Sequence, residues 1–339
     1  MSSPTPASQK GWGSFQSPSV ELLIHQSDAE YRAPSMPAFV DEFPVPDMLI
    51  PRKSVASVSS ASSVGESPTP LGRASCLSTL FLLDASWIFI NHGAFGATLR
   101  SMLSVRNAWS EYMEAQPLRF LDREVLPLLV QVTREMAQFV GCARTDLTLH
   151  TNATTALNVL FKSFSFKPAD KILRLNLAYG AVKKMVADTG ATVVEVDIAL
   201  PLRSKKHLLD AVVAVLDAPE HKGQWKLAVF DHIASNSAIV HPIEELTQLC
   251  HARGVPILVD GAHSLGSVPL SLSASGVDYF VSNCHKWLCN PKGAAIMYVA
   301  PKWQQTIRPL IISHGTGAGF SSDFICKSSH LRILACISL

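Results

Sequence analysis

The sequence predicts an α/β fold, in which a mostly parallel sheet of about seven strands carries helices on both faces. Short apolar or β-branched runs of strand length recur between residues 146 and 299. Stretches with apolar residues at helical spacing separate several of these runs. Because parallel neighbours need a crossover connection, this alternation is typical of a sheet buried between two helical layers.

The predicted elements follow one another in a regular order. Two helices come first, over Ala97–Trp109 and Glu124–Val140, and Gly141 provides a stop for the second. The predicted strands are Asp146–His150, Lys171–Leu175, Ala191–Ile198, Leu227–Ile233, Pro256–Val259, Val277–Val281 and Ala294–Val299. The helices predicted between them are Thr155–Phe164, Ala181–Thr189, Lys206–Leu216 and Ile243–Arg253.

Residues 1–75 differ in composition from the rest of the chain. Ser, Pro and Ala dominate there without a helix or strand period, so we expect a disordered Ser/Pro-rich leader. An organelle transit peptide is the alternative interpretation, although acidic residues such as Glu21, Asp28 and Glu42 argue against it. Residues 80–325 are predicted to form the folded domain, and residues 326–339 an atypical tail.

The composition argues against several classes of protein. Lys and Arg number 29 against 27 Asp and Glu, a formal charge of +2, which gives no reason to expect a nucleic-acid partner. The seven cysteines form no C-x-x-C pair, so we expect no metal site and no disulfide framework, and a reducing, cytoplasmic location. The apolar run Leu77–Ile90 is interrupted by Asp84 and is shorter than the roughly 20 residues of a membrane-spanning helix.

Charged residues follow two neighbouring predicted strands, at the edge where parallel sheets bind their ligands. Asp260 comes directly after Pro256–Val259, and Lys286 follows Val277–Val281. The Asp can be a simple helix cap, and the Lys a solvated side chain lying on apolar surface. A Lys in an apolar pocket, however, becomes a nucleophile that forms a Schiff base with a carbonyl. Together the two residues form the pair that pyridoxal 5′-phosphate requires, an amine for its aldehyde and a carboxylate for its ring nitrogen.

A candidate phosphate-binding turn precedes the predicted helix Thr155–Phe164. The small and hydroxyl residues at positions 151–155 offer N–H groups and side-chain donors to an anion. Simple capping of the helix is the alternative interpretation. Tyr179, which follows the strand Lys171–Leu175, could stack on a planar ring, although a core or surface position is the commoner fate of a Tyr.

Two motifs give the sequence a family resemblance. Asp260-Gly-Ala-His-Ser-Leu-Gly266 and Asn283-Cys-His-Lys-Trp-Leu-Cys-Asn-Pro-Lys-Gly293 closely resemble class V aminotransferases of pyridoxal-phosphate fold type I. Upstream segments at 90–96, 119–121, 152–155 and 231–235 are similar to the isopenicillin N epimerase-like branch, which includes cysteine desulfhydrases. The resemblance runs from about residue 80 to residue 325. It implies a homodimer that acts on a small amino acid.

The resemblance also implies roles for particular residues. Lys286 would form the Schiff base, and Asp260 would pair with the ring nitrogen. The other implied cofactor contacts are His263 and Ser235 near the phenolic oxygen, Tyr179 on the ring face, and Ala153, Thr154, Asn283 and His285 at the phosphate. The loop 91–96, with Asn91, His92 and Gly93, would admit the substrate carboxylate.

The shared motifs leave the reaction open. Once Lys286 has removed the Cα proton, epimerisation, loss of a β-thiol and transamination are all available. We expect a C–S lyase or desulfhydrase acting on a cysteine-type substrate, because a long Ser/Pro-rich leader in this branch is commoner among such lyases; an epimerase or aminotransferase is the alternative. The resemblance fades near Asp323, before the family's small C-terminal domain. A truncated, catalytically silent fragment that still binds the cofactor is therefore a further alternative.

Overall fold

The computed structural model describes residues 20–40, 80–221 and 223–312. Most of the predicted leader and the whole predicted tail, residues 326–339, lie outside the described residues. Among the residues that the structure describes, no helix has the length and apolar character needed to cross a membrane.

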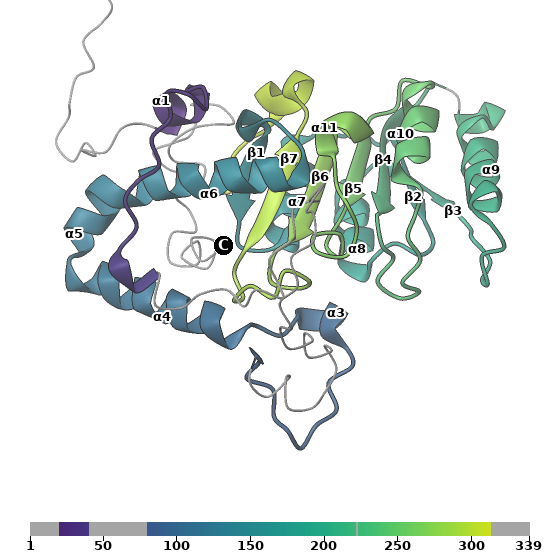
Figure 1. The fold of residues 1–339 in the computed structure, drawn as a ribbon. Helices are drawn as coiled ribbons and strands as arrows, with labels where there is room; N and C mark the ends of the chain where they lie inside the picture. Colours follow the sequence, from purple (N-terminus) through teal and green to yellow (C-terminus); the bar gives the residue numbers. More distant parts are fainter. Residues whose placement is uncertain (1–19, 41–79, 222, 313–339) are drawn as a thin grey trace, which may run out of the picture.

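Seven strands form one sheet in the order β1-β7-β6-β5-β4-β2-β3 (Figure 1). The strands are β1 Leu147–His150, β2 Lys171–Leu175, β3 Thr192–Val196, β4 Trp225–Asp231, β5 Ile257–Asp260, β6 Tyr279–Asn283 and β7 Ala295–Val299. The five strands from β6 to β3 are parallel, whereas β7 is antiparallel to both of its neighbours. No helix lies between β6 and β7, so the chain reverses there instead of crossing over. The predicted mostly parallel sheet is thus confirmed.

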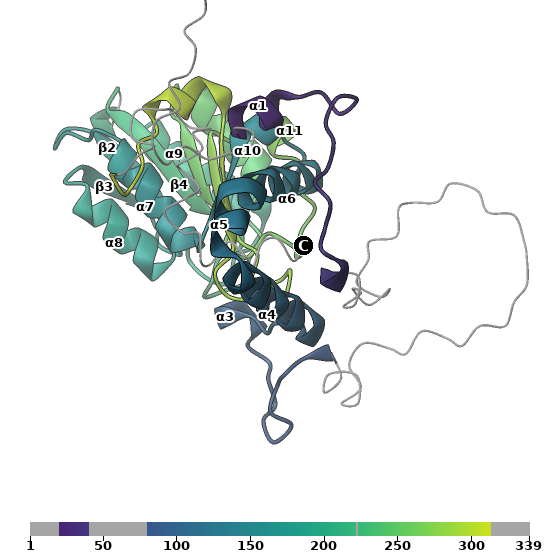
Figure 2. The same ribbon diagram turned by 90° about the vertical axis from the view of Figure 1, so that its left-hand side faces the viewer.

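Helices cover both faces of this sheet (Figures 1 and 2). The α-helices are α1 Val20–His25, α3 His92–Phe95, α4 Arg100–Ala115, α5 Pro117–Arg119, α6 Val125–Val140, α7 Ala153–Ser163, α8 Gly180–Asp188, α9 Lys205–Leu216, α10 Ile243–His251 and α11 Leu272–Ser275. Short 3-10 segments are η1 Ala38–Val40, η4 Arg144–Asp146, η5 Pro219–His221 and η6 Pro301–Thr306, and η3 Phe120–Glu124 is a π-helical turn.

Side chains of the strands alternate between two apolar clusters. In β4, Ala228 and Phe230 belong to the cluster that contains residues of α6, α9 and α10. Leu227 and Val229 belong to the cluster formed with α7 and α8. This period of two, with apolar residues on both sides, is what a sheet buried between two helical layers requires.

The two longest helices, α4 and α6, diverge from α5 (Figure 1). The helix α6 agrees with the predicted Glu124–Val140, and Gly141 ends it in a left-handed conformation with φ of 67°, which a glycine adopts without steric cost. The helix α4 is displaced toward the C-terminus from the predicted Ala97–Trp109.

Residues 20–40 of the predicted disordered leader are folded against the domain. Arg134 on α6 donates hydrogen bonds to the main-chain oxygens of Leu23 and Gln26, and its guanidinium lies 4.0 Å from the ring centroid of Tyr31. Arg144 donates to the carbonyl of Ile24 at 2.6 Å. For this part of the leader the prediction of disorder is wrong, because arginines more than 100 positions away satisfy carbonyls that a six-residue helix leaves open.

The carboxyl ends of the parallel strands meet at one edge of the sheet. Asp231, the last residue of β4, pairs in register with Asp260, the last residue of β5. Asp260 pairs in turn with Val281 of β6. This register brings the turn after β6, which contains Lys286, beside the two aspartates.

Candidate active site

Two carboxyl groups lie side by side at this edge. Asp231 and Asp260 are both buried, with 4% of each residue exposed. Burial raises the pKa of Asp231, the neighbouring Asp260 raises it further, and Lys286 acts in the opposite direction. Burial also raises the pKa of Asp260, against the effect of Lys286. Two carboxylates cannot both ionise at low cost in such a place, so the pair favours a proton or a cation between them.

The hydrogen bonds of this pair are incomplete. Asp260 Oδ1 accepts from the Ala262 N–H at 3.0 Å, and Asp231 Oδ2 accepts from the Tyr179 N–H at 3.1 Å. The other oxygen of Asp231, Oδ1, is buried without a hydrogen-bond partner among the described residues. Because an unpaired buried oxygen costs free energy, the site suits a ligand that brings an N–H group or a positive charge.

Lys286 provides an amine with a perturbed pKa in the same place. Its side chain is half-buried, and its Nζ lies 3.2 Å from Nε2 of His263. Burial lowers the pKa of Lys286, while Asp260 and Asp231 raise it and only partly offset the effect of burial. A larger share of this lysine is therefore uncharged near neutral pH than of a solvated one, and only an uncharged amine attacks a carbonyl.

His263 connects Lys286 to an indole. Its Nδ1 accepts a hydrogen bond from Nε1 of Trp287 at 3.2 Å. Burial lowers the pKa of His263 to about 4, and Lys286 contributes to the decrease. The imidazole is therefore neutral at physiological pH, as its contact with an amine requires.

The loop predicted to admit a substrate carboxylate packs against the turn of Lys286. His92 Nε2 lies 2.7 Å from the main-chain oxygen of Lys286, to which it can donate. Gly96 has a φ of +73°, and a Cβ there would lie 2.0 Å from the oxygen of His285. A Cβ on Gly93 would come within 3.3 Å of the side chains of His263 and Trp287. The glycines thus allow a close approach of the two loops, and His92 helps to hold the main chain of the lysine.

The predicted phosphate contacts gather at the start of α7. The side chain of Asn152 caps the helix by accepting from the Thr155 N–H at 2.8 Å. Asn283 Oδ1, from the end of β6, accepts from the Ala153 N–H at 2.9 Å. Thr154 is exposed in the first turn, where the helix dipole favours an anion. The capping interpretation is therefore correct for Asn152, while the phosphate role of this turn stays a prediction.

Three further predicted residues lie nearby in different settings. His285 is half-buried, with Nδ1 at 3.1 Å from the Ala294 oxygen, and burial lowers its pKa. Tyr179 lies at the start of α8 with 45% of the residue exposed, and its contact with Asp231 is made by its main chain. Ser235 lies in an exposed turn that follows β4. The stacking role of Tyr179 and the contact from Ser235 stay predictions.

The residues predicted for the site do not include Asp231, His232 or Trp287, which the structure places in or beside it. The signal for Asp231 was present, because it ends an apolar strand just as Asp260 does. His232 shares a hydrogen bond between its Nδ1 and Ser264 Oγ at 2.9 Å, and burial lowers its pKa to about 4. Trp287 directly follows Lys286 in the chain, and 40% of it is exposed.

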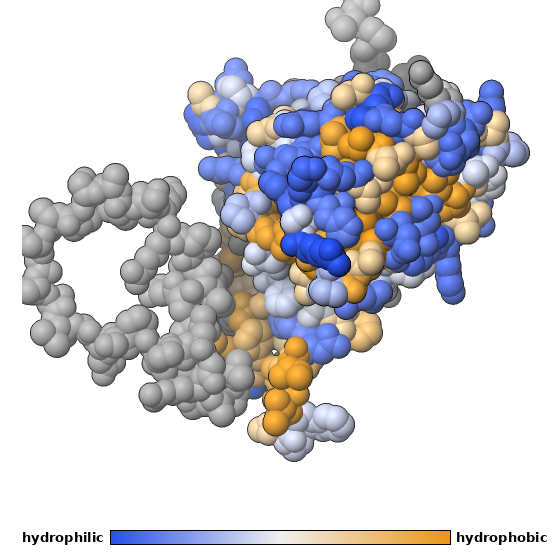
Figure 3. Space-filling model, turned by 90° about the vertical axis from the view of Figure 1, so that its right-hand side faces the viewer, coloured by the Kyte–Doolittle hydropathy of each residue, from blue (hydrophilic) through white to orange (hydrophobic). Residues whose placement is uncertain are grey.

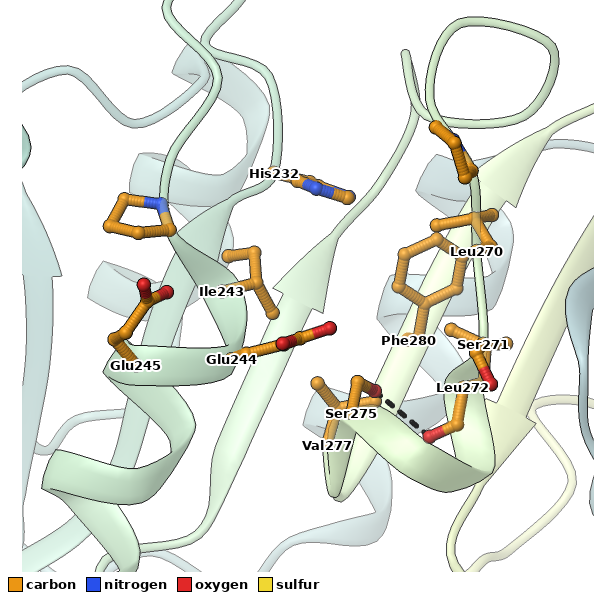
Figure 4. A pocket seen from close by; sticks show the side chains of 12 residues that line it. His232, Ile243, Glu244, Glu245, Leu270, Ser271, Leu272, Ser275, Val277 and Phe280 are labelled. Carbon is orange, nitrogen blue, oxygen red and sulfur yellow. Dashed lines mark hydrogen bonds between the residues drawn. The ribbon is translucent and has the colours of Figure 1, made fainter.

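A small cavity of about 210 Å³ lies behind this site, between α10 and α11 (Figure 4). His232 and Phe280 line the side toward the strands, and Figure 4 shows Glu244 reaching in from the first turn of α10. None of the residues predicted for the site lines this cavity. This cavity is therefore separate from the residues predicted for the site.

Comparisons with known proteins identify related sequences. The sequence profile of the aminotransferase class-V family matches residues 120–325. The rice protein (Oryza sativa subsp. japonica) named "Putative L-cysteine desulfhydrase 1" is 35% identical over 69% of this chain and 52% of its own length. L-cysteine desulfhydrase of Arabidopsis thaliana is 29% identical over 68% of this chain and 54% of its own length. Isopenicillin N epimerase of Streptomyces clavuligerus is 28% identical over 75% of this chain and 65% of its own length. The chain thus spans about half the length of the first two relatives.

Solved structures share the fold at low sequence identity. A complex of the cystine C-S lyase C-DES with its product cysteine persulfide superposes with a TM-score of 0.62 at 20% identity, over 78% of this chain and 73% of that one. A cysteine desulfurase from Thermococcus onnurineus NA1 superposes with a TM-score of 0.60 at 17% identity, over 78% of this chain and 69% of that one. These similarities establish the fold and leave the reaction to be argued from the site.

Proposed function

The chain belongs to the aminotransferase class-V family, and on this premise we propose that it is a pyridoxal 5′-phosphate-dependent enzyme that cleaves the C–S bond of a cysteine-type amino acid. The observation that carries the proposal is the half-buried amine of Lys286, whose pKa is set by burial and by Asp260 and Asp231. A reactive amine beside a buried carboxylate is the minimum that this cofactor requires.

The residues of the site fit the cofactor. Asp260, and beside it the unpaired Oδ1 of Asp231, would receive the protonated ring nitrogen. The first turn of α7, with Thr154 exposed, would hold the phosphate. When bound, pyridoxal phosphate supplies an aldehyde for the amine and a ring that withdraws electrons from the substrate Cα.

The remaining chemistry belongs to residues of this chain. The free amine of Lys286 would accept the Cα proton of the substrate at its Nζ. Asp260 would pair with the protonated ring nitrogen and hold that positive charge in place. His92 holds the main chain of Lys286 in place through the hydrogen bond to its carbonyl.

The cysteine-type substrate is supported by the names of the relatives. Two of them, from rice and Arabidopsis thaliana, are named as L-cysteine desulfhydrases. We propose the same reaction here: after Cα deprotonation the β-carbon–sulfur bond breaks and its electron pair leaves with the sulfur as sulfide, and water then hydrolyses the remaining enamine to ammonia and pyruvate. Epimerisation is the alternative, since isopenicillin N epimerase is also a relative.

Incubation of the full chain with pyridoxal phosphate and L-cysteine tests this function. We expect sulfide and pyruvate in equal amounts, and a loss of about 10³-fold or more in rate for Lys286→Ala. Epimerised amino acid without sulfide would replace the proposal by the epimerase alternative. An absorbance band near the visible edge that depends on Lys286, without turnover of any amino acid, would instead identify a silent cofactor-binding fragment.

We also propose that the protein is a homodimer. The support is an apolar arm, defined by Trp87, Ile88, Ile90 and Phe95, in which Ile88 and Ile90 are 90% and 89% exposed. Figure 3 shows this arm as a hydrophobic projection at the lower edge of the molecule. Exposed apolar groups of this kind mark contact surfaces.

For the location of the protein we propose the cytoplasm, with an organelle as the alternative. The scattered cysteines support a reducing compartment, whereas one relative, from Arabidopsis thaliana, is named as chloroplastic. A fluorescent fusion at the C-terminus of the full chain distinguishes the two: diffuse cytoplasmic signal is expected, and confinement to an organelle would contradict the proposal.

A further inference from the structure

Three side chains form a short chain of hydrogen bonds across two loops of the site. Nε1 of Trp287 lies 3.2 Å from Nδ1 of His263. Nε2 of His263 lies 3.2 Å from Nζ of Lys286. His263 belongs to the loop after β5, while Lys286 and Trp287 belong to the turn after β6. The imidazole therefore bridges two neighbours in the same turn.

The chemistry of these groups fixes the direction of every bond. An indole nitrogen only donates, so the ring nitrogen of His263 that faces Trp287 must be the acceptor. A neutral imidazole carries a single proton, which must then lie on Nε2. The Nε2–H points at Nζ of Lys286, and an amine accepts a hydrogen bond only when it is uncharged.

We propose that Trp287 is a positioning residue that holds His263 in its Nε2–H tautomer and thereby favours the uncharged amine of Lys286. The indole does this without touching the amine. The tautomer stands on the geometry alone, and its value for catalysis rests on the proposed function.

The position of the indole is itself determined by its neighbours. The ring of His92 lies 5.0 Å from the Trp287 ring, centroid to centroid, and the main chain of Gly93 lies against its edge. A Cβ on Gly266 would lie 2.7 Å from the Trp287 oxygen. The indole thus packs against the loop of α3, while the turn of Gly266 fixes the main chain of Trp287, so the indole N–H keeps one direction although the residue is partly exposed.

The donated hydrogen bond opposes the charges around the lysine. Asp260 on β5 and Asp231 on β4 both favour the ammonium form of Lys286. Of the histidines near the turn, His285 bonds to the Ala294 oxygen and His92 to the Lys286 oxygen, so neither is directed at Nζ. His263 is therefore the group in direct contact that opposes the two carboxyls.

The tautomer of His263 is measured in the full-length protein from which carbonyl cofactors have been removed. Nitrogen-15 NMR with labelled histidine, assigned with His263→Gln, should show a protonated Nε2 in the wild-type protein. In Trp287→Phe, which keeps an aromatic ring, the proton should move wholly or partly to Nδ1. A protonated Nδ1 in the wild type, or no change in Trp287→Phe, would overturn the proposal.

A matched control comes from a second indole. Trp303 donates its Nε1–H to Asp278 Oδ1 at 2.8 Å, on η6 and away from Lys286. Trp303→Phe removes the same chemical group and should leave the tautomer of His263 unchanged. If it shifted the tautomer as much as Trp287→Phe, a general loosening of the fold would explain the result and the proposal would fail.

The charge of Lys286 gives an independent readout. Acetylation of Lys286 is followed by mass spectrometry as a function of pH in the same cofactor-free proteins. The pH midpoint of this reaction should rise by about one pH unit in Trp287→Phe and should not change in Trp303→Phe. An unchanged profile in Trp287→Phe would contradict the proposal. Both measurements are made without pyridoxal phosphate, so absence of desulfhydrase activity would remove the proposed function and leave these results standing.

Discussion

At the scale of single residues, the turn of Lys286 depends on glycines that let neighbouring loops approach it. Gly96 faces the main chain of His285 and Lys286, and its φ of +73° lies in the left-handed region. Gly190 has nearly the same φ, +74°, but a Cβ there would meet nothing within 4 Å. A comparison of substitutions at the two positions therefore measures how much the close contact at Gly96 adds to the cost of a positive φ.

We therefore expect Gly96→Ala to destabilise the protein much more than Gly190→Ala. The positive φ costs about 1 kcal/mol at either position. At Gly96 the ψ of 154° lies in a region that only glycine adopts readily, and the contact with His285 adds about 2 kcal/mol. Urea denaturation of both variants measures the difference. Equal losses of stability in the two variants would show that the loop of α3 moves to accept the Cβ and does not fix the turn of Lys286.

The buried pair of Asp231 and Asp260 predicts an unusual dependence of stability on pH. Their pKa values are raised above the ordinary value of about 4, so the folded protein binds more protons than the unfolded chain. The stabilisation from these extra protons is fully present at pH values below the unfolded pKa. It is lost as the pH rises through the raised pKa values of the folded protein. Asp231→Asn removes one charge of the pair and should flatten the profile.

The measurement is the free energy of unfolding of the cofactor-free protein between pH 5 and pH 8. In the wild type it should decrease with pH more steeply than in Asp231→Asn. Asp210→Asn serves as the control, because Asp210 is an exposed carboxylate paired with Lys206, and it should keep the wild-type slope. Parallel profiles for the wild type and Asp231→Asn would refute the raised pKa values.

At the scale of secondary-structure elements, Asp278 joins three of them at the end of the sheet opposite the site. Its carboxyl accepts from His251 of α10 at 2.7 Å, from Trp303 of η6 at 2.8 Å and from the Ile257 N–H of β5 at 2.8 Å. Lys302 lies 2.6 Å away. Burial raises the pKa of Asp278, but the hydrogen bonds outweigh it and hold the pKa below its usual value.

Asp278→Asn should accordingly cost about 3 kcal/mol of stability near neutral pH, as the loss of a buried, fully hydrogen-bonded charge does. Because the pKa of Asp278 is lowered in the folded protein, this stabilisation is fully present at pH values above the unfolded pKa of about 4. It is lost as the pH falls through the folded pKa. Thermal or urea unfolding of Asp217→Asn, an exposed carboxylate paired with Arg253, provides the comparison and should show a much smaller loss of stability.

The strands of the sheet are the part of the fold that the sequence could predict. Each of the seven strands was predicted within a few residues, because apolar runs bounded by turns identify buried strands. Asp260 and Lys286 follow from such boundaries, since an element's end fixes which side chains lie at the edge of the sheet. The folding of residues 20–40 could not be predicted, because it depends on Arg134 and Arg144 of a distant segment. The hydrogen bond from Trp287 to His263 could not be predicted for a similar reason, since only the folded loops bring the two side chains together.

At the scale of the whole molecule, the apolar arm is the surface that we expect a second copy of the chain to cover. Trp87, Ile88 and Ile90 belong to the loop before α3, and Phe95 belongs to α3 itself. The helix α3 packs against the turn of Lys286 through His92. Burial of these side chains in a dimer would remove apolar surface from water and steady the loop that contains His92 and Gly93.

The double variant Ile88→Ser/Ile90→Ser tests this arrangement. Because burial of each isoleucine contributes about 1.5–3 kcal/mol, replacing two per copy should weaken association by at least 100-fold and convert the dimer to a monomer at micromolar concentration. Size-exclusion chromatography with light scattering measures the mass. Leu200→Ser, in the exposed segment between β3 and α9 at the opposite end of the sheet, is the control and should leave the dimer intact. A monomeric wild type, or a dimer that survives the double variant, would exclude the arm as the dimer contact.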